Sequence, residues 1–172
     1  MKKIILTGGH GCGKSTILLG LEGRGEVIVR EAASDYQRIQ RVRGYPFPTD
    51  TDDFEEAVLK LHLFRENLLE KTTYPRVFLD RGAPDHLVYS DLCNWPLSPE
   101  LKKAAMEKIY HRVFLVQPFG SDWRGMVTRA ERRLSLKLAQ RLFEIYSALQ
   151  VPVFKVPPGP LEKRIDFVIG HS

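Results

Sequence analysis

The sequence has few cysteines and no long apolar run. Its two cysteines, Cys12 and Cys93, are too few for a disulfide framework and lack the spacing of a metal site. The five histidines are scattered without an H-x-x-H or H-E-x-x-H pattern, which argues against a zinc site. No stretch approaches the length of a membrane span, and the apolar run near the N-terminus is too short for a signal peptide. We therefore expect a cytoplasmic protein that keeps its thiols reduced and has no membrane partner.

The sequence also shows no repeat, no low-complexity tract and no sign of a second domain. Its 172 residues, 43% hydrophobic and 27% charged, predict one globular domain over residues 1–172. The net charge of +5 suits either a nucleic acid or a small polyphosphate ligand. Because the basic excess is local, the small ligand is favoured over the nucleic acid. The basic residues between Phe119 and Arg141 are Arg124, Arg129, Arg132, Arg133, Lys137 and Arg141, against Asp122 and Glu131.

Residues 8–15 match the phosphate-binding loop pattern G-x-x-x-x-G-K-[ST] at every fixed position. A β-type run at 3–7 precedes the loop and an apolar, helix-like run at 17–21 follows it, which is the context that the motif requires. Glycines let backbone N–H groups approach phosphate oxygens, and the start of a helix adds a positive dipole end. Lys14 should reach the β- and γ-phosphates, and the Ser15 hydroxyl should hold Mg²⁺. The expected nucleotide-binding residues are Gly8, Gly9, His10, Gly11, Cys12, Gly13, Lys14, Ser15 and Thr16.

Strand-like runs alternate with segments of helical periodicity, which predicts an α/β fold. Such folds have a mostly parallel sheet covered on both faces, and the ligand binds at the carboxyl ends of the strands. The expected strands are 3–7, 26–30, 76–80, 113–116 and 151–156, and the longer expected helices include 32–43, a segment from 51 or 52 to about 72, and 128–149. The second of these helices should bury a stripe of Phe54, Ala57, Val58, Leu61, Phe64 and Leu68, and the third a stripe of Leu134, Leu138, Leu142, Ile145 and Leu149.

Polar side chains follow the expected strands, so they should gather at one edge of the sheet. Asp80 ends the third strand, as the second magnesium-site acid of phosphate-loop proteins does, and would hold the metal through water or orient a hydroxyl. Its neighbour Arg81 would face a phosphate or a substrate oxygen, or form an ion pair. Glu31, after the second strand, could accept a proton from an attacking hydroxyl or bind Mg²⁺ through water. The residues alone leave these alternatives open.

The segment of about 117–133 is predicted to be an arginine-rich lid. Arg124 and Arg129 would close over the transferring phosphate, a contact worth about 10³–10⁵ in rate in comparable enzymes. Arg133, Lys137 and Arg141, farther along the same helix, fit a solvated helix face instead.

Three segments together resemble a known family. They are the loop at 8–16, the stretch Val29-Arg30-Glu31-Ala32-Ala33, and the D-R-G-x-x-D-x-x-x-Y stretch from Asp80 to Tyr89. The chain resembles small AAA-type predicted ATPases or kinases of the P-loop NTPases, which are similar to the ribosylnicotinamide kinase domain and to deoxynucleoside and thymidylate kinases. The resemblance implies a three-layer fold with a five-stranded parallel sheet in the order 2-3-1-4-5, acids at the positions of Glu31 and Asp80, and an arginine lid.

The expected activity is phosphoryl transfer from ATP, with Mg²⁺, to a small nucleoside- or nucleotide-like acceptor, in a monomer or a homodimer. The catalytic residues would be Lys14, Glu31, Asp80, Arg81, Arg124 and Arg129, with Ser15 and Asp80 at the metal. The sequence has no N-K-x-D segment of the GTPase type, which favours ATP over GTP. Two rivals remain: a triphosphatase that uses water as its acceptor, and a polynucleotide end kinase or nucleic-acid-binding ATPase.

Overall fold

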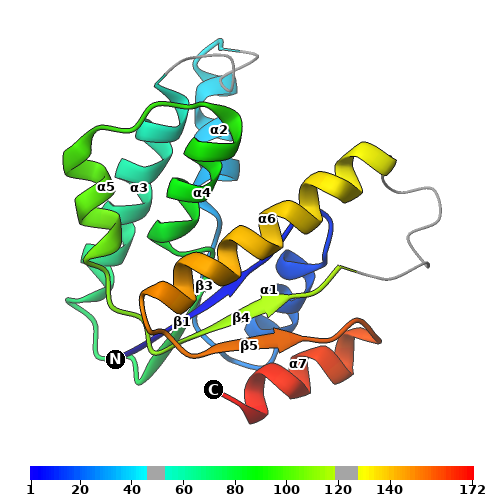
Figure 1. Ribbon diagram of the computed structural model, residues 1–172. Coiled ribbons are helices and arrows are strands. Elements are labelled where there is room, and N and C mark those ends of the chain that lie inside the picture. The colour runs from blue at the N-terminus through cyan, green and yellow to red at the C-terminus, as the bar shows by residue number, and fades with distance from the viewer. Residues whose placement is uncertain (46–52, 119–127) are drawn as a thin grey trace.

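Five parallel strands form a sheet in the order β2-β3-β1-β4-β5, as the family resemblance implied. The computed structural model describes residues 1–45, 53–118 and 128–172, and its helices lie on both faces of the sheet (Figure 1). The strands are β1 (Lys2–Thr7), β2 (Ile28–Val29), β3 (Arg76–Asp80), β4 (Arg112–Val116) and β5 (Val153–Val156). The helices are α1 (Lys14–Gly23), α2 (Ala32–Val42), α3 (Phe54–Leu69), α4 (Ala83–Cys93), α5 (Pro99–Met106), α6 (Arg129–Ala148) and α7 (Leu161–Gly170).

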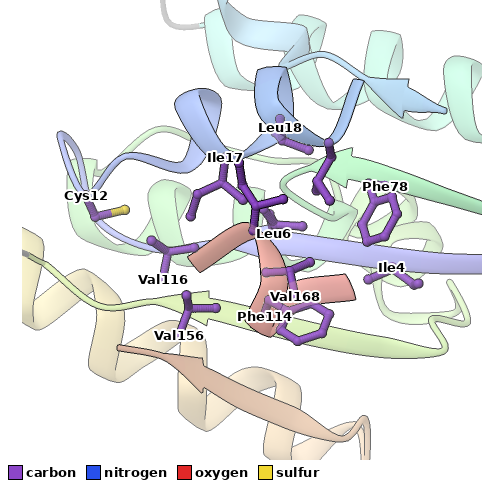
Figure 2. Close-up of a cluster of buried hydrophobic side chains, with 12 residues drawn as sticks. Ile4, Leu6, Cys12, Ile17, Leu18, Phe78, Phe114, Val116, Val156 and Val168 are labelled. Atoms are coloured by element: carbon purple, nitrogen blue, oxygen red, sulfur yellow. The ribbon is translucent and has the colours of Figure 1, made fainter. Parts of the chain in front are cut away.

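Residues 4–7 of the central strand β1 are buried, and Ile4, Ile5 and Leu6 bring apolar side chains to both of its faces. Successive residues of a strand point to opposite faces. Ile4 and Leu6 therefore join a cluster with α1 and α7, which includes Ile17 and Val168 (Figure 2). Ile5 lies on the other face and packs with side chains of α4 and α6. A core on each face holds the carboxyl end of β1, and so the phosphate loop that follows it, in a set position.

Helix α3 buries a different face from the one that its apolar stripe predicted. Phe54 and Val58 are buried as expected, but Phe64 is 59% exposed and Leu68 is 45% exposed. The buried positions of α3 include three polar residues, Glu55, His62 and Glu66, which sit next to apolar ones on the same side of the helix. Tertiary hydrogen bonds to these side chains outweigh the apolar pattern, because a buried polar group is tolerated once it is paired.

Smaller differences concern the ends of elements and one leucine. The expected strand 26–30 shortens to the two residues of β2, which pairs only with β3. On α6, Leu138 and Leu142 are buried as expected, whereas Leu134 is 46% exposed and lines a cavity. In the described parts of the chain, no helix has the length and apolar character needed to cross a membrane.

Candidate active site

The phosphate loop connects β1 to α1 with the backbone that its glycines permit. Gly11 and Gly13 adopt positive φ angles of 68° and 88°, a region that residues with a Cβ rarely enter. Gly13 precedes the first residue of α1, and no side-chain hydrogen bond caps that end of the helix. The first backbone N–H groups of α1 are thus turned toward the loop, the arrangement by which helix N-termini bind anions.

The Lys14 ammonium lies over the loop that it follows. Its Nζ donates a hydrogen bond to the Gly9 carbonyl oxygen at 3.2 Å and lies 4.0 Å from the Cys12 sulfur. Burial, and then the nearby Arg81 guanidinium, lower the pKa of Lys14 from its usual value. Cys12 itself packs into the core rather than into the cavity, so only its backbone belongs to the binding loop.

Helix α6 packs so closely on the loop that Gly9 has no room for a side chain. A Cβ at Gly9 would overlap the Ser135 hydroxyl oxygen and would lie 2.8 Å from the Ser135 Cβ. We expect Gly9→Ala to lower the free energy of unfolding by about 1–3 kcal/mol, the usual cost of overpacking, and to raise the KM for ATP by displacing the loop. Thermal unfolding and steady-state kinetics measure the two effects.

Gly23→Ala is the matched control for this prediction. Gly23 is a residue of helix α1. Apart from its chain neighbours and the backbone of that helix, no described atom lies within 4 Å of a Cβ placed at Gly23. The control should keep or slightly raise stability, since alanine favours helix more than glycine does. A Gly9→Ala protein as stable and active as the Gly23→Ala protein would show that α6 can move away freely.

Ser15 and Asp80 meet where the loop and the end of β3 come together. The Ser15 hydroxyl donates to Asp80 Oδ2 at 3.3 Å. Asp80 Oδ1 is buried and has no hydrogen-bond partner among the described residues. Burial raises the pKa of Asp80, although the Lys14 and Arg81 charges oppose this. A carboxylate oxygen left without a partner beside a hydroxyl fits a hard cation that keeps most of its other ligands as water and phosphate, as Mg²⁺ does.

Glu31 and Arg81 form an ion pair beside this point. The Arg81 Nε donates to Glu31 Oε1 at 2.6 Å, and the Ser34 hydroxyl donates to Glu31 Oε2 at 2.5 Å. Burial alone would raise the pKa of Glu31, but Arg81 and Ser34 together lower it to about 2. Arg81 also lies over the Tyr89 ring, with its guanidinium carbon 4.7 Å from the ring centre. Glu31 is therefore ionised at neutral pH and held in one orientation.

One cavity of about 490 Å³ is lined by these groups and by further side chains, most of them from four helices, and we call the part lined by these further side chains its second chamber. Its phosphate end is lined by His10, Gly11, Lys14, Ser15, Glu31, Asp80 and Arg81. The other end is lined by side chains from α2, α3, α4 and α6, together with Trp95: Ala33, Ser34, Gln37, Phe54, Glu55, His86, Tyr89, Leu92, Cys93, Trp95, Leu134 and Leu138. Half of these side chains lie within 36–52 and 86–97, the segments in which the sequence predicts that acceptor specificity resides. No local motif marks the others, such as Phe54 and Leu138, because helices far apart in the chain bring them together.

The structure brings the expected residues of the loop and strand ends together, but it does not describe the lid. Arg124 lies outside the described residues, and so does the side chain of Arg129, although its backbone begins α6. Their lid role stays a prediction. Arg141 is exposed and pairs with Asp91 at 2.6 Å.

A family model matches most of this chain, and several solved structures share its fold. The family model described as AAA domain matches residues 3–164. No curated protein matches the sequence. Among solved structures, deoxyadenosine kinase from M. mycoides with products dCMP and dCDP aligns with a TM-score of 0.68 and 14% identity over 98% of this chain and 97% of that one.

NadR proteins align equally well over part of their length. NadR in complex with NR has a TM-score of 0.70 and 16% identity over 99% of this chain and 51% of that one. NadR in complex with NAD and AMP-PNP has a TM-score of 0.67 and 18% identity over 98% of this chain and 49% of that one. At these identities the likeness concerns the fold.

Proposed function

The chain belongs to the AAA domain family, and from that premise we propose that it is an ATP-dependent phosphotransferase with a small nucleoside- or nucleotide-like acceptor. The observation that carries this proposal is the single cavity, which runs from Lys14 and Ser15 into a chamber lined by Phe54 and Trp95. A phosphate donor at one end and an organic acceptor at the other would meet within it. A triphosphatase has no use for the second chamber, since its acceptor is water.

The phosphate loop is the proposed site of the ATP phosphates. Backbone N–H groups of the loop and of the start of α1 would bind the phosphate oxygens, and Lys14 would neutralise the charge on the β- and γ-phosphates. Ser15 and Asp80 would hold Mg²⁺, which would neutralise part of the phosphate charge when bound. The buried, unpaired Asp80 Oδ1 supports this assignment.

Glu31 is the proposed acceptor of the proton from the attacking hydroxyl. It is ionised, it lines the phosphate end of the cavity, and Arg81 and Ser34 hold its carboxylate in place. Its low pKa makes it a weak base before the reaction, so it would take the proton only as the hydroxyl oxygen bonds to phosphorus and becomes acidic. Asp80 remains the alternative proton acceptor.

Glu31→Gln should lower kcat by about 10²–10⁴, the usual contribution of a general base, while the affinity for ATP changes little. Glutamine keeps the shape and the hydrogen bond from Ser34 but cannot take a proton. Rates at saturating ATP and acceptor, set against ATP binding by calorimetry, separate the two effects.

Glu26→Gln provides the matched control. Glu26 also pairs with an arginine, Arg76, whose Nε donates to it at 2.9 Å, but the pair does not line the cavity. Its loss should leave kcat unchanged. Should Glu31→Gln transfer phosphate at the normal rate, Asp80 or water takes the proton.

Acceptor-dependent transfer tests the activity itself. With labelled ATP and Mg²⁺, a panel of nucleosides and nucleotides should yield a labelled acceptor, and a thermal-shift screen finds the candidates because a bound ligand stabilises the fold. Equal phosphate release with and without acceptor would identify a triphosphatase. Oligonucleotide binding with a steep salt dependence, through the exposed Arg132, Arg133 and Lys137 of α6, would identify a nucleic-acid protein.

A further inference from the structure

Helix α3 buries a line of polar side chains that the proposed phosphoryl transfer does not use. Glu55, His62 and Glu66 are 4%, 5% and 0% exposed, and they share one side of the helix. His86 of α4, 4% exposed, lies opposite them. Polar groups this deep are costly unless they are paired, so their contacts must account for their position.

The four side chains form one hydrogen-bonded chain. His86 Nδ1 is 2.6 Å from Glu55 Oε1, His86 Nε2 is 3.4 Å from His62 Nδ1, and His62 Nε2 is 3.0 Å from Glu66 Oε1. At its inner end, Glu66 also accepts hydrogen bonds from Lys3 at 3.0 Å and from the Tyr110 hydroxyl at 2.7 Å. At its outer end, Glu55 and His86 line the second chamber of the cavity.

The chain needs one more proton than two neutral histidines carry. Each of its three contacts requires a proton between two lone pairs, whereas two neutral imidazoles have only one N–H each. With both carboxylates ionised, one of the two histidines is therefore positively charged. The chain holds one exchangeable proton, and its loss must break one of the three contacts.

The extra proton lies at the cavity end of the chain. Burial lowers the pKa of His62, which favours its neutral form. Burial alone would raise the pKa of Glu66, but the hydrogen bond and charge of His62, and then the Lys3 charge, bring it to about 2. Ionised Glu66 can only accept, so His62 donates to it and accepts from His86. His86 then also donates to Glu55, and its charge offsets that of the Glu55 carboxylate.

We propose that Glu55 is the residue that selects the acceptor: its carboxylate accepts a hydrogen bond from an amino group on the ring of a nucleoside, with His86 as the positioning residue that holds the carboxylate in place. The inference rests on the proposed function. A carboxylate has about four lone-pair sites, and His86 occupies one of them, so capacity for a ligand donor remains. The faces of Phe54 and Trp95, whose rings lie 5.6 Å apart in an edge contact, offer flat surfaces for the ring itself.

Binding of matched nucleosides tests the proposal without any transfer. Cytidine differs from uridine, and adenosine from inosine, by an amino group in place of a carbonyl oxygen. By calorimetry with Mg²⁺ and a non-hydrolysable ATP analogue, the amino members should bind about tenfold or more tightly, since a hydrogen bond to a charged group contributes about 1.5–3 kcal/mol.

Glu55→Gln should remove the preference within each pair, because an amide can turn to offer either a donor or an acceptor. Glu56→Gln is the matched control, since the neighbouring Glu56 pairs with Lys60 at 2.8 Å and does not line the cavity. His86→Asn keeps a donor for Glu55, so it should retain the preference.

The measurements on the unmodified protein decide the matter even if a variant fails to fold. Equal binding within the pairs, tighter binding of the carbonyl members, or no binding of any of the four nucleosides would each overturn the proposal. Failure of the proposed function looks different: the amino nucleosides would bind with the expected preference, yet no phosphate would pass to them from ATP.

Discussion

Lys14→Ala is expected to lower ATP-dependent phosphoryl transfer by about two orders of magnitude or more, the cost of losing one electrostatic contact to a charged transition state. Lys14 is 7% exposed, and its ammonium donates a hydrogen bond to the Gly9 carbonyl oxygen. Without the lysine, water can donate a hydrogen bond to the Gly9 carbonyl oxygen instead, so the fold should survive. Burying a charge is itself unfavourable, as the lowered pKa of Lys14 indicates. The stability of the nucleotide-free protein should therefore hold or rise while activity falls.

Turnover, ATP affinity and thermal unfolding, measured on one preparation, separate these effects. Arg141→Ala is the control, because it also removes a positive charge but one that is exposed and paired with Asp91. It should leave turnover close to normal. A folded Lys14→Ala protein with unchanged turnover and ATP affinity would refute the phosphate-loop assignment.

Asp80→Asn should weaken the dependence on magnesium, with a loss of about 10- to 100-fold in metal affinity or turnover, typical for residues that orient a bound metal. Asparagine keeps the shape of the side chain but loses the negative charge that a cation needs. A magnesium titration of the rate measures the shift. Asp91→Asn, an exposed acid on α4, should leave the titration unchanged.

Asp80→Asn should raise the stability of the fold, although it lowers the activity. The pKa of Asp80 is raised in the folded protein, chiefly by burial, so the folded state holds its proton more tightly than the unfolded chain does. Above the folded pKa, ionised Asp80 therefore destabilises the fold, and neutral asparagine removes that cost. Without magnesium at neutral pH, Asp80→Asn should unfold at a higher temperature. A drop in both stability and activity would instead assign Asp80 a structural role.

The phosphate loop and the order of strand and helix could be predicted because they depend on neighbours in the chain. The glycines, Lys14 and Ser15 lie within eight positions and need only a strand before and a helix after. The acids Glu31 and Asp80 follow apolar runs, so the rule that parallel strands end at one edge was enough to bring them together. The sequence also put Ser15 and Asp80 at one expected site and left an ion pair open for Arg81. It could not name Glu31 as the partner of Arg81, since that depends on how side chains turn once they meet.

Helix α3 shows where this kind of reasoning fails. Its apolar spacing predicted that Phe64 and Leu68 would be buried, and both are exposed. The helix instead buries Glu55, His62 and Glu66, which a pattern of hydropathy assigns to solvent. Only hydrogen bonds from α4, from Tyr110 and from Lys3 make those positions tolerable, and these partners lie 24 to 63 residues away in the chain.

By itself, the sequence determined the fold class, the phosphate loop and the polar residues at the strand ends, because each depends on a local pattern of glycine, charge or apolar spacing. The tertiary structure alone decided which face of α3 is buried, how α6 rests on Gly9, and how Glu55 and His86 come to line the second chamber. The physical reason is that these features are contacts between helices distant in the chain. Their free energy depends on which partner reaches a buried polar group, and no short stretch of sequence encodes that partner.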